Sequence, residues 1–333
     1  MAKRPSSVLG AHVRWSESFE VDYAEFLDDS LTECFDLRAG LEKNQEAGSE
    51  REKEWWILKP GMSDRGQGIK LFSTMEELQG IFDKWDEERP ASDDGGDEDE
   101  GEEANENEVV SGTAKDYITT SHLRHFIAQP YIHPPLLVDS TKFHIRTYVL
   151  ALGRFQVYVY NKMLALFAPS PYVPPWEDAS PSAHLTNTCL QGTSPDSSSV
   201  RLFDDLPLSD SLKESIRREI GEVVGEAFEA AARSMTIHFQ PLHNAFEVFG
   251  VDFLVDAEGR TWLLEVNSFP DFKQTGGGLK RLVEGLWEGV LGRVIGSFFA
   301  SEVGGRGGDG GCKESDHDDG MVLVREVELS NAF

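Results

Sequence analysis

The sequence predicts an α+β protein built from mixed or antiparallel sheets with flanking helices. Three features of its 333 residues support this class. Short segments of alternating apolar and polar residues predict strands, and two pairs of them are close enough along the chain to form hairpins. Longer segments repeat their apolar residues with the period of a helix. The two kinds of segment are interspersed, and a chain of this length can fill one large core or two or three small lobes.

The composition excludes several classes of partner. The formal net charge is −28, so we expect neither nucleic acid nor membrane as a partner, because both attract basic surfaces. The three cysteines are far apart and odd in number, which argues against a disulfide framework and favours a reducing compartment. No segment has the apolar length of a signal-peptide core or a membrane span. We therefore expect a cytoplasmic protein, and the sequence leaves its oligomeric state open.

The first third of the chain predicts a helix followed by a strand, loop, strand and helix. Apolar residues recur at helical spacing over residues 22–45, so one amphipathic helix is expected there. Strands are expected at 55–58 and 69–72, around a loop that contains glycine. Thr74 and Glu77 fit a capping box that opens the next helix.

An acidic run follows that helix. Residues 93–108 carry ten acidic groups and no Lys or Arg. Such a segment cannot bury enough apolar surface to fold, so we expect a disordered insertion over about 90–115 and favour this over a dedicated interaction segment.

The second half of the chain begins with predicted strands. They lie within 123–138 and 142–160, and the second of these segments contains a probable hairpin turn at Gly153. Proline and serine clusters predict loops at 169–181 and 192–199.

The remaining elements are a long helix, a hairpin and a last helix. Ser211 and Glu214 fit a cap at the start of the long amphipathic helix. A hairpin at 249–267 precedes the last helix, which runs through Phe299. The Gly-rich segment that follows predicts a flexible tail, with MVLVREVEL after it as a candidate edge strand.

The loop between the first two strands has the composition of a phosphate-binding loop. Lys59 and Arg65 stand toward its two ends, and Gly61, Gly66 and Gly68 let backbone N–H groups approach phosphate oxygens. Taken alone, the segment also fits an ordinary turn between strands, because it matches no complete nucleotide-binding motif.

Three potentially cationic side chains alternate along one predicted strand. The two-residue period places Lys142, His144 and Arg146 on one face. The opposite face carries Phe143, Ile145 and Thr147. A solvated sheet face is the alternative, but Tyr148 and Leu150 continue the first face and favour the wall of a cleft.

The hairpin near the C-terminus predicts a metal site. If residues 256–259 form the turn, Asp252 faces Leu263, and Glu265 and Asn267 share their face, with Asp252 diagonal to Glu265. Two carboxylates and an amide supply the oxygen ligands that Mg²⁺ prefers. A pair of edge carboxylates is the alternative, which the apolar surroundings disfavour because an unpaired charge is costly there.

Taken together and in order, five segments resemble the tubulin–tyrosine-ligase-like family of the ATP-grasp superfamily, above all its fungal members. They are WWILKPGMSDRGQGI, IAQPYI, KFHIRTYVLA, HLTNTC and FGVDFLVD…WLLEVNSFPDF. The resemblance implies an ATP-grasp fold, with a nucleotide cleft between lobes. It places a ligase domain at 51–300, after an N-terminal helical segment at 1–50 that looks like a shortened form, and before a flexible tail at 301–333.

The resemblance also implies a reaction and its site. ATP and Mg²⁺ would be cofactors, and a free amino acid such as tyrosine would be joined to a protein acceptor such as tubulin. Arg146 would bind the carboxylate or acyl phosphate, Glu265 would be catalytic, and Asp252, Glu265 and Asn267 would bind Mg²⁺. Nucleotide contacts are implied for Lys59, Arg65, Gly66, Gly68, Ile69, Gln129, Pro130, Tyr131, Ile132, Lys142, His144, Thr186 and Asn187.

Three positions depart from the family's pattern. His144 stands where Asp is usual, Pro130 where a basic residue usually follows Gln129, and Leu166 where an Arg commonly grips the substrate. Two other functions stay open, and His144, Leu166, the short N-terminal segment and the acidic composition favour the first of them. One is a catalytically weak or inactive ATP-binding module in a larger cytoplasmic assembly, and the other is a small-molecule ligase.

Overall fold

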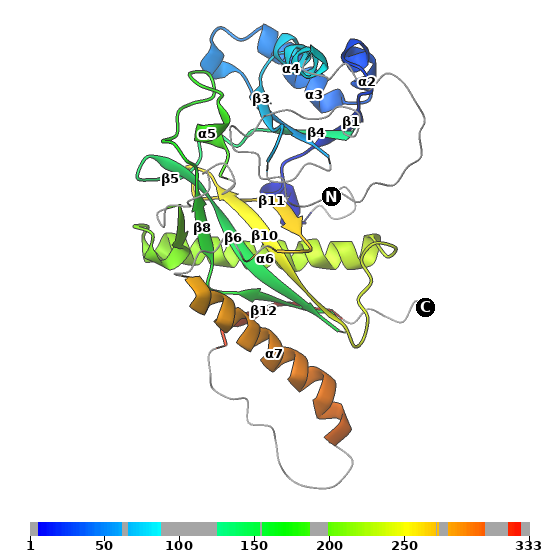
Figure 1. Cartoon of the computed structure of the whole chain (residues 1–333), viewed down its shortest axis with the longest axis vertical. Helices are drawn as coiled ribbons and strands as arrows, with labels where there is room; N and C mark the ends of the chain where they lie inside the picture. Colours follow the sequence, from blue (N-terminus) through cyan, green and yellow to red (C-terminus); the bar gives the residue numbers. More distant parts are fainter. Residues whose placement is uncertain are drawn as a thin grey trace, which may run out of the picture. The chain divides into compact units, whose positions relative to one another are not determined.

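The structure of the protein is a computed structural model, which describes residues 6–61, 66–87, 125–153, 155–186, 199–270, 272, 279–303 and 319–327 (Figure 1). The chain forms two compact units, each with its own sheet. Unit 1 comprises Met1–Arg14, Ile132–Pro174 and Ser182–Phe333, and unit 2 comprises Trp15–Tyr131 and Pro175–Pro181. Every described strand pair is antiparallel, which confirms the predicted α+β class.

Unit 2 is a four-stranded sheet with helices on one face. The strand order is β1-β4-β2-β3. Its strands are β1 (Glu17–Glu20), β2 (Trp56–Pro60), β3 (Lys70–Phe72) and β4 (His125–Pro130). Its helices are η1 (Ala24–Phe26), α2 (Leu27–Ser30), α3 (Phe35–Gln45), η2 (Glu50–Glu52) and α4 (Met75–Glu87).

Alternation along the strands separates the two faces of this sheet. Leu58, Phe72 and Phe126 point into a core that they share with α2, α3 and α4. The neighbouring positions Lys59 and Gln129 lie on the opposite face, because successive side chains of a strand alternate. The helices therefore leave the face with Lys59 and Gln129 uncovered by that core.

The single helix expected over 22–45 is wrong. The segment is divided into η1, α2 and α3, with a break between Ser30 and Phe35. Leu27, Leu31 and Leu37 are nevertheless all fully buried in one core. The apolar spacing thus identifies the side on which both α2 and α3 are buried, but it does not detect the break between the two helices.

The predicted capping box at the start of α4 is confirmed. The backbone N–H of Glu77 donates to Thr74 Oγ1 at 3.1 Å, and the N–H of Thr74 donates to Glu77 Oε2 at 3.2 Å. Both bonds satisfy donors that the first turn of a helix leaves unpaired.

Unit 1 is an eight-stranded sheet with a main order of β11-β10-β6-β7-β12. Its strands are β5 (Leu137–Val138), β6 (Thr141–Leu152), β7 (Gln156–Tyr160), β8 (Leu164–Phe167), β9 (Val200–Leu202), β10 (Phe246–Val255), β11 (Thr261–Asn267) and β12 (Met321–Glu326). Its helical elements are α1 (Leu9–His12), α5 (Pro181–His184, which begins at the last residue of unit 2), η4 (Phe203–Asp205), α6 (Asp210–Ser234) and α7 (Lys280–Val303).

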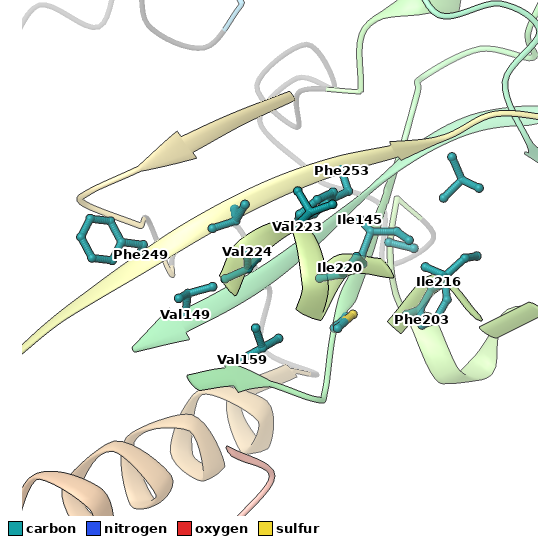
Figure 2. Packing of buried hydrophobic residues seen from close by; sticks show 14 of the residues in the cluster. Ile145, Val149, Val159, Phe203, Ile216, Ile220, Val223, Val224, Phe249 and Phe253 are labelled. Carbon is teal, nitrogen blue, oxygen red and sulfur yellow. The ribbon is translucent and has the colours of Figure 1, made fainter. Parts of the chain in front are cut away.

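Two long helices cover opposite faces of this sheet. Ile145 and Phe253 point toward α6, where they meet Ile220 and Val223 in the largest core (Figure 2). On the other face, side chains of β6 such as Tyr148 pack with residues of α7 in a second core. Successive side chains of β6 alternate between these two faces, and this alternation determines which of them enter the core with α6.

The start of α6 differs from the sequence prediction. Ser209, not Ser211, is the N-cap residue, and its Oγ accepts from the backbone N–H of Leu212 at 3.3 Å. Ser211 lies inside the first turn and contacts Ser209 through its hydroxyl at 3.2 Å. The expected edge strand after the Gly-rich segment is present as β12, which pairs with β7.

Two further expectations concern the acidic run and membrane-spanning segments. The acidic run at 93–108 lies outside the described residues. Within the ranges that the structure covers, no helix has both the length and the apolarity needed to span a membrane.

Candidate active site

The candidate site of unit 1 begins with the polar row on β6. Lys142, His144 and Arg146 share one face, as predicted, while Phe143 and Ile145 enter the core with α6. Lys142 and His144 are each only 6% exposed. A solvated sheet face does not explain such burial, so these side chains need a structural or chemical role.

Arg146 is held by an acidic residue of the neighbouring strand. It lies opposite Asp252 of β10, and its Nε and Nη2 donate to Asp252 Oδ1 and Oδ2, the second at 2.7 Å. Burial by itself lowers the pKa of the guanidinium, but these hydrogen bonds and the charges of Asp252, Tyr148 and Glu265 raise it above its ordinary value overall. Arg146 is therefore always positively charged, and it compensates the charge of the buried Asp252 carboxylate.

The hairpin register differs from the predicted one. Val255 pairs with Thr261 and Phe253 with Leu263, so Asp252 does not face Leu263. A β-bulge between Asp252 and Phe253 then brings Asp252 directly opposite Glu265. Leu263 instead packs on the face covered by α6, while Leu264 joins the opposite face.

The bulge keeps the predicted oxygen groups on one face. Direct cross-strand partners share a face, and the pairs are Asp252 with Glu265 and Gly250 with Asn267. Asn267 Nδ2 donates to Glu265 Oε1 at 3.0 Å, and Glu265 is exposed to solvent. The expected face-sharing of Asp252, Glu265 and Asn267 is confirmed, with direct pairing of the two carboxylates where a diagonal was expected.

These residues fit Mg²⁺ in the chemistry of their donors. Asp252, Glu265 and Asn267 offer carboxylate and amide oxygens. Among the residues that the structure covers, no three His, Cys, Asp or Glu side chains form a metal-holding group. A cation at this place would therefore rely on two carboxylates together with the amide and ligand oxygens, which is the usual arrangement for Mg²⁺ with nucleotides.

His144 is buried beside this pair and bonded to Thr186. Its Nδ1 lies 2.6 Å from Thr186 Oγ1, and both residues are buried. Burial lowers the pKa of His144 to about 3, with Arg146 and Lys142 adding to the effect and Glu265 opposing it. The imidazole is therefore neutral at physiological pH.

Unit 2 carries the other predicted nucleotide residues. Lys59 Nζ donates to Gln129 Oε1 at 3.2 Å across β2 and β4. Gly66 and Gly68 have φ values of 79° and 69°, a region that glycine enters without strain, and Ile69 N–H donates to the Gly66 carbonyl at 3.4 Å. The loop therefore needs its glycines for its shape.

The implied nucleotide contacts from Gln129 to Ile132 span the point at which the chain passes from unit 2 to unit 1. Gln129 and Pro130 end β4, Tyr131 is the last residue of that stretch of unit 2, and Ile132 begins the next stretch of unit 1. Arg65 and Asn187 lie outside the described residues.

Sequence reasoning missed the contact between Arg146 and Asp252. It assigned them separate roles, on a substrate and on a metal. Their pairing depends on the register of β6 against β10, which joins segments about a hundred residues apart. No local pattern signals that register, although the buried surroundings of both side chains point to a need for mutual compensation.

Comparison with known proteins gives a consistent picture. The family described as "Tubulin-tyrosine ligase family" matches residues 11–301. A probable tubulin–tyrosine ligase of Schizosaccharomyces pombe is 48% identical over 304 residues, which cover 91% of this chain and 73% of that protein. The probable tubulin–tyrosine ligase PBY1 of Saccharomyces cerevisiae is 43% identical over 310 residues, which cover 90% of this chain but only 40% of that protein.

A solved structure supports the same relationship. The C-terminal domain of Pby1 from K. lactis, described as an ATP-grasp enzyme interacting with the mRNA decapping enzyme Dcp2, matches with a TM-score of 0.63. The two are 37% identical, and the match covers 98% of this chain and 75% of the other.

Proposed function

The chain belongs to the tubulin–tyrosine ligase family and is an ATP-grasp enzyme, and from this premise we propose that it joins a carboxylate to an amine with cleavage of ATP. The proposed reaction phosphorylates the carboxylate and releases ADP. Attack of the amine on the acyl carbon then forms an amide and releases phosphate and a proton. Such a reaction is catalysed mainly by positioning and charge neutralisation.

The observation that carries the proposal is the polar cluster on one face of β6, β10 and β11, in which Asp252 is buried against Arg146 and Glu265 is exposed. Among the described residues, Arg146 uses Nε and one hydrogen of Nη2 on Asp252, which leaves three of its five N–H groups to grip a carboxylate or acyl phosphate. Asp252, Glu265 and Asn267 would hold Mg²⁺, which when bound neutralises phosphate charge. Lys142 and Thr186 are proposed nucleotide contacts within unit 1, and Lys59 and residues 66–69 are proposed nucleotide contacts within unit 2.

Nucleotide binding is the first test of this proposal. Mg-ATP at 100 times its dissociation constant should stabilise the folded protein by about 2.7 kcal/mol, because only the folded state has the site. Thermal unfolding with and without Mg-ATP measures this, and AMP at equal concentration is the control. An unchanged melting curve for folded protein would rule out nucleotide binding.

The proposed substrates are a free amino acid, tyrosine first, and the C-terminus of a protein such as tubulin. The names of the S. pombe and S. cerevisiae relatives support this choice. Incorporation of labelled tyrosine into detyrosinated tubulin, with ADP release measured in parallel, tests it directly.

A second function is favoured by two observations. Leu166 is 4% exposed and pairs with His144 across β8 and β6, so a buried leucine occupies the place of a substrate-gripping arginine. The K. lactis relative is also described as a partner of Dcp2. On this alternative the chain is a catalytically weak or inactive ATP-binding module of a larger assembly. Capture of Dcp2 that survives Glu265→Ala, together with no ADP release for any acceptor, would favour it.

A further inference from the structure

The outer side of α2 and α3 in unit 2 carries an exposed hollow around Phe35. Phe35 is the first residue of α3 and is 73% exposed, whereas Leu37 on the inner side of the same helix is fully buried. The hollow has a volume of about 440 Å³ and is lined by residues of α2, of α3 and of the break between them. These residues, which we call the Phe35 hollow, are Asp28, Thr32, Phe35, Arg38, Ala39 and Glu42.

Two more aromatic rings are exposed just before α2. Tyr23 and Phe26 are 51% and 48% exposed and pack edge to face, with ring centroids 6.1 Å apart. Single exposed apolar side chains are common on any surface, but three exposed aromatic residues within residues 23–35 are a concentration that is typical of protein contact sites. The charges around them indicate what kind of partner this surface fits.

The charge around the hollow is strongly negative. Residues 17–42 carry nine acidic side chains and one basic side chain, that of Arg38. Arg38 Nη1 donates to Asp28 Oδ1 at 3.0 Å, so this cation is already compensated by a carboxylate of the hollow. Glu42 adds a second carboxylate to the lining. The charge that remains for a partner is therefore negative.

The thiol of Cys34, directly before Phe35, lies in the same negative field. Its pKa is raised to about 11, first by burial and then by the charges of Glu17 and Glu33, while Arg38 opposes them. The carboxylates near the start of α3 thus outweigh the nearby cation, and this place attracts a positively charged group.

An exposed aromatic ring among carboxylates offers both parts of a site for a basic side chain. The ring face attracts a guanidinium or ammonium group, and the carboxylates form ion pairs with it. We propose that the Phe35 hollow docks a basic segment of a partner protein, with an arginine or lysine side chain over the Phe35 ring. A second copy of this chain fits less well, because two molecules of net charge −28 repel each other.

This docking is independent of the proposed ligase activity. The inner side of α3 shares a core with one face of the unit 2 sheet, while Lys59 and Gln129 lie on the opposite face. Within unit 2, a segment bound in the Phe35 hollow therefore lies on the far side of the helices from the proposed nucleotide contacts. Its binding can be measured without an assay of activity.

The charge of the hollow is tested by fluorescence anisotropy of labelled octa-arginine and octa-lysine, titrated with the full chain at physiological salt. Glu42→Gln should weaken the binding of octa-arginine about 2-fold, because it removes a carboxylate that pairs with the peptide. Glu258→Gln removes an exposed carboxylate of unit 1, has the same net charge and should bind as the wild type. Equal losses in the two variants would show that the peptide follows net charge alone and would overturn the proposal.

The aromatic ring is tested by three substitutions of Phe35. Phe35→Ala and Phe35→Leu should bind octa-arginine about 2- to 5-fold more weakly, because both lose the ring face, and Phe35→Trp should keep the affinity. A preference of the wild type for octa-arginine over octa-lysine should disappear in Phe35→Ala, because only a guanidinium stacks flat on the ring. Phe269→Ala, which removes a 91% exposed ring of unit 1, is the matched control. Thermal unfolding should be unchanged in all of these variants, because both rings are mostly exposed.

The remaining outcomes each decide the proposal. Weaker binding in Phe35→Ala and Glu42→Gln, with both unit 1 controls unchanged, supports it. Unchanged affinity of Phe35→Ala, or no binding of either peptide to the wild type, would overturn it. Sedimentation that shows a concentration-dependent dimer of the wild type, abolished by Phe35→Ala, would assign the hollow to a second copy of the chain and would overturn the basic partner.

Discussion

Asp252 and Glu265 face each other across the hairpin, yet their removal should have different costs. Asp252 is 4% exposed and compensates Arg146, whereas Glu265 is exposed and bonded to Asn267. Breaking a buried ion pair by removing one partner costs about 3–5 kcal/mol, because the other charge stays buried. Asp252 is thus both a structural and a candidate metal-binding residue, and Glu265 is the cleaner probe of chemistry.

We predict that Glu265→Ala lowers turnover at least roughly a hundredfold without lowering the melting temperature, since the variant loses a carboxylate that neutralises phosphoryl charge. Asp252→Ala should lose activity and also unfold more easily. ADP release and thermal unfolding measure the two effects. Glu258→Ala, in the exposed turn of the same hairpin, is the matched control. Normal turnover of Glu265→Ala would leave the carboxylate pair with a structural role only.

The buried imidazole of His144 should make stability depend on pH. Its pKa is lowered from 6.5 to about 3, first by burial and then by Arg146 and Lys142. Between these values the unfolded chain binds a proton at His144 and the folded protein does not. Stability from this group is therefore complete above about pH 6.5 and is lost as the pH falls toward 3.

We predict that the unfolding free energy of the wild type falls with decreasing pH more steeply than that of His144→Asn, by up to about 1.4 kcal/mol per pH unit. Urea unfolding between pH 4 and 7 measures the difference. His238→Asn removes an exposed histidine and serves as the control. Parallel pH profiles for wild type and His144→Asn would show that the ring binds protons as readily in the folded protein as in the unfolded chain.

At the level of elements, the sequence predicted which face of the hairpin carries Asp252, Glu265 and Asn267, but it did not predict which residues of β10 and β11 pair. The turn shifts the predicted pairing by one residue, and the bulge beside Asp252 shifts it by one more. Two shifts of one residue return Glu265 and Asn267 to the predicted face of the hairpin. Leu263 lies before the bulge, is shifted only once, and therefore lies on the other face. Without the bulge, Glu265 would face the core with α6. The bulge lies in the pairing of β10 with β11, while β10 keeps an unbroken register with β6, and no local pattern in TWLLEVN encodes it.

Helix boundaries failed for a related reason. The expected helix over 22–45 is broken before Phe35, and Ser209 replaces Ser211 as the cap of α6. Apolar spacing reports which side is buried, and it continues across a break when both pieces pack on one core. Only Ser211 has a Glu three residues later, as in a capping box, yet Ser209 is the N-cap, with an extended backbone and a bond from the Leu212 N–H to its hydroxyl. The Thr74 box was unambiguous and was confirmed.

Two glycines of α7 provide a test of how β12 is held. A Cβ at Gly289 would lie 2.9 Å from the Asp319 carbonyl oxygen and 2.9 Å from Met321 Cγ, whereas a Cβ at Gly292 meets nothing within 4 Å. Gly→Ala within a helix is otherwise worth about 0.5–1 kcal/mol of stabilisation. The two positions therefore differ in the contact with the segment that leads into β12.

We predict that Gly292→Ala stabilises the protein by up to about 1 kcal/mol and that Gly289→Ala destabilises it, because the added methyl group displaces residues 319–321. Urea unfolding measures both changes, and limited proteolysis reports release of β12. Equal stabilisation by the two substitutions would show that β12 does not pack on α7 at Gly289.

For the whole molecule, the family and the fold class followed from the order of several segments, while the division into units did not. The contiguous ranges 1–50, 51–300 and 301–333 remain a proposal about domains. The structure groups residues 1–14 with unit 1, where His12 Nδ1 lies 2.7 Å from the Thr261 carbonyl oxygen. Such grouping depends on contacts between segments distant in sequence, and composition along the chain cannot reveal them.

The last prediction concerns how this acidic molecule meets an acidic acceptor such as a tubulin tail. The net charge of −28 should repel the acceptor, and deleting residues 93–108 would reduce it to −18 because they carry ten acidic groups and no Lys or Arg. Beyond a Debye length of about 8 Å at physiological salt, exposed charges are screened. The deletion should therefore accelerate association mainly at low salt and leave maximal turnover unchanged.

Tyrosine incorporation at low and physiological salt, for wild type, the deletion and Glu265→Ala, measures this. A deletion that changes maximal turnover would show that the run acts on chemistry, and a wild type that binds Mg-ATP but transfers no tyrosine would exclude tubulin as the acceptor.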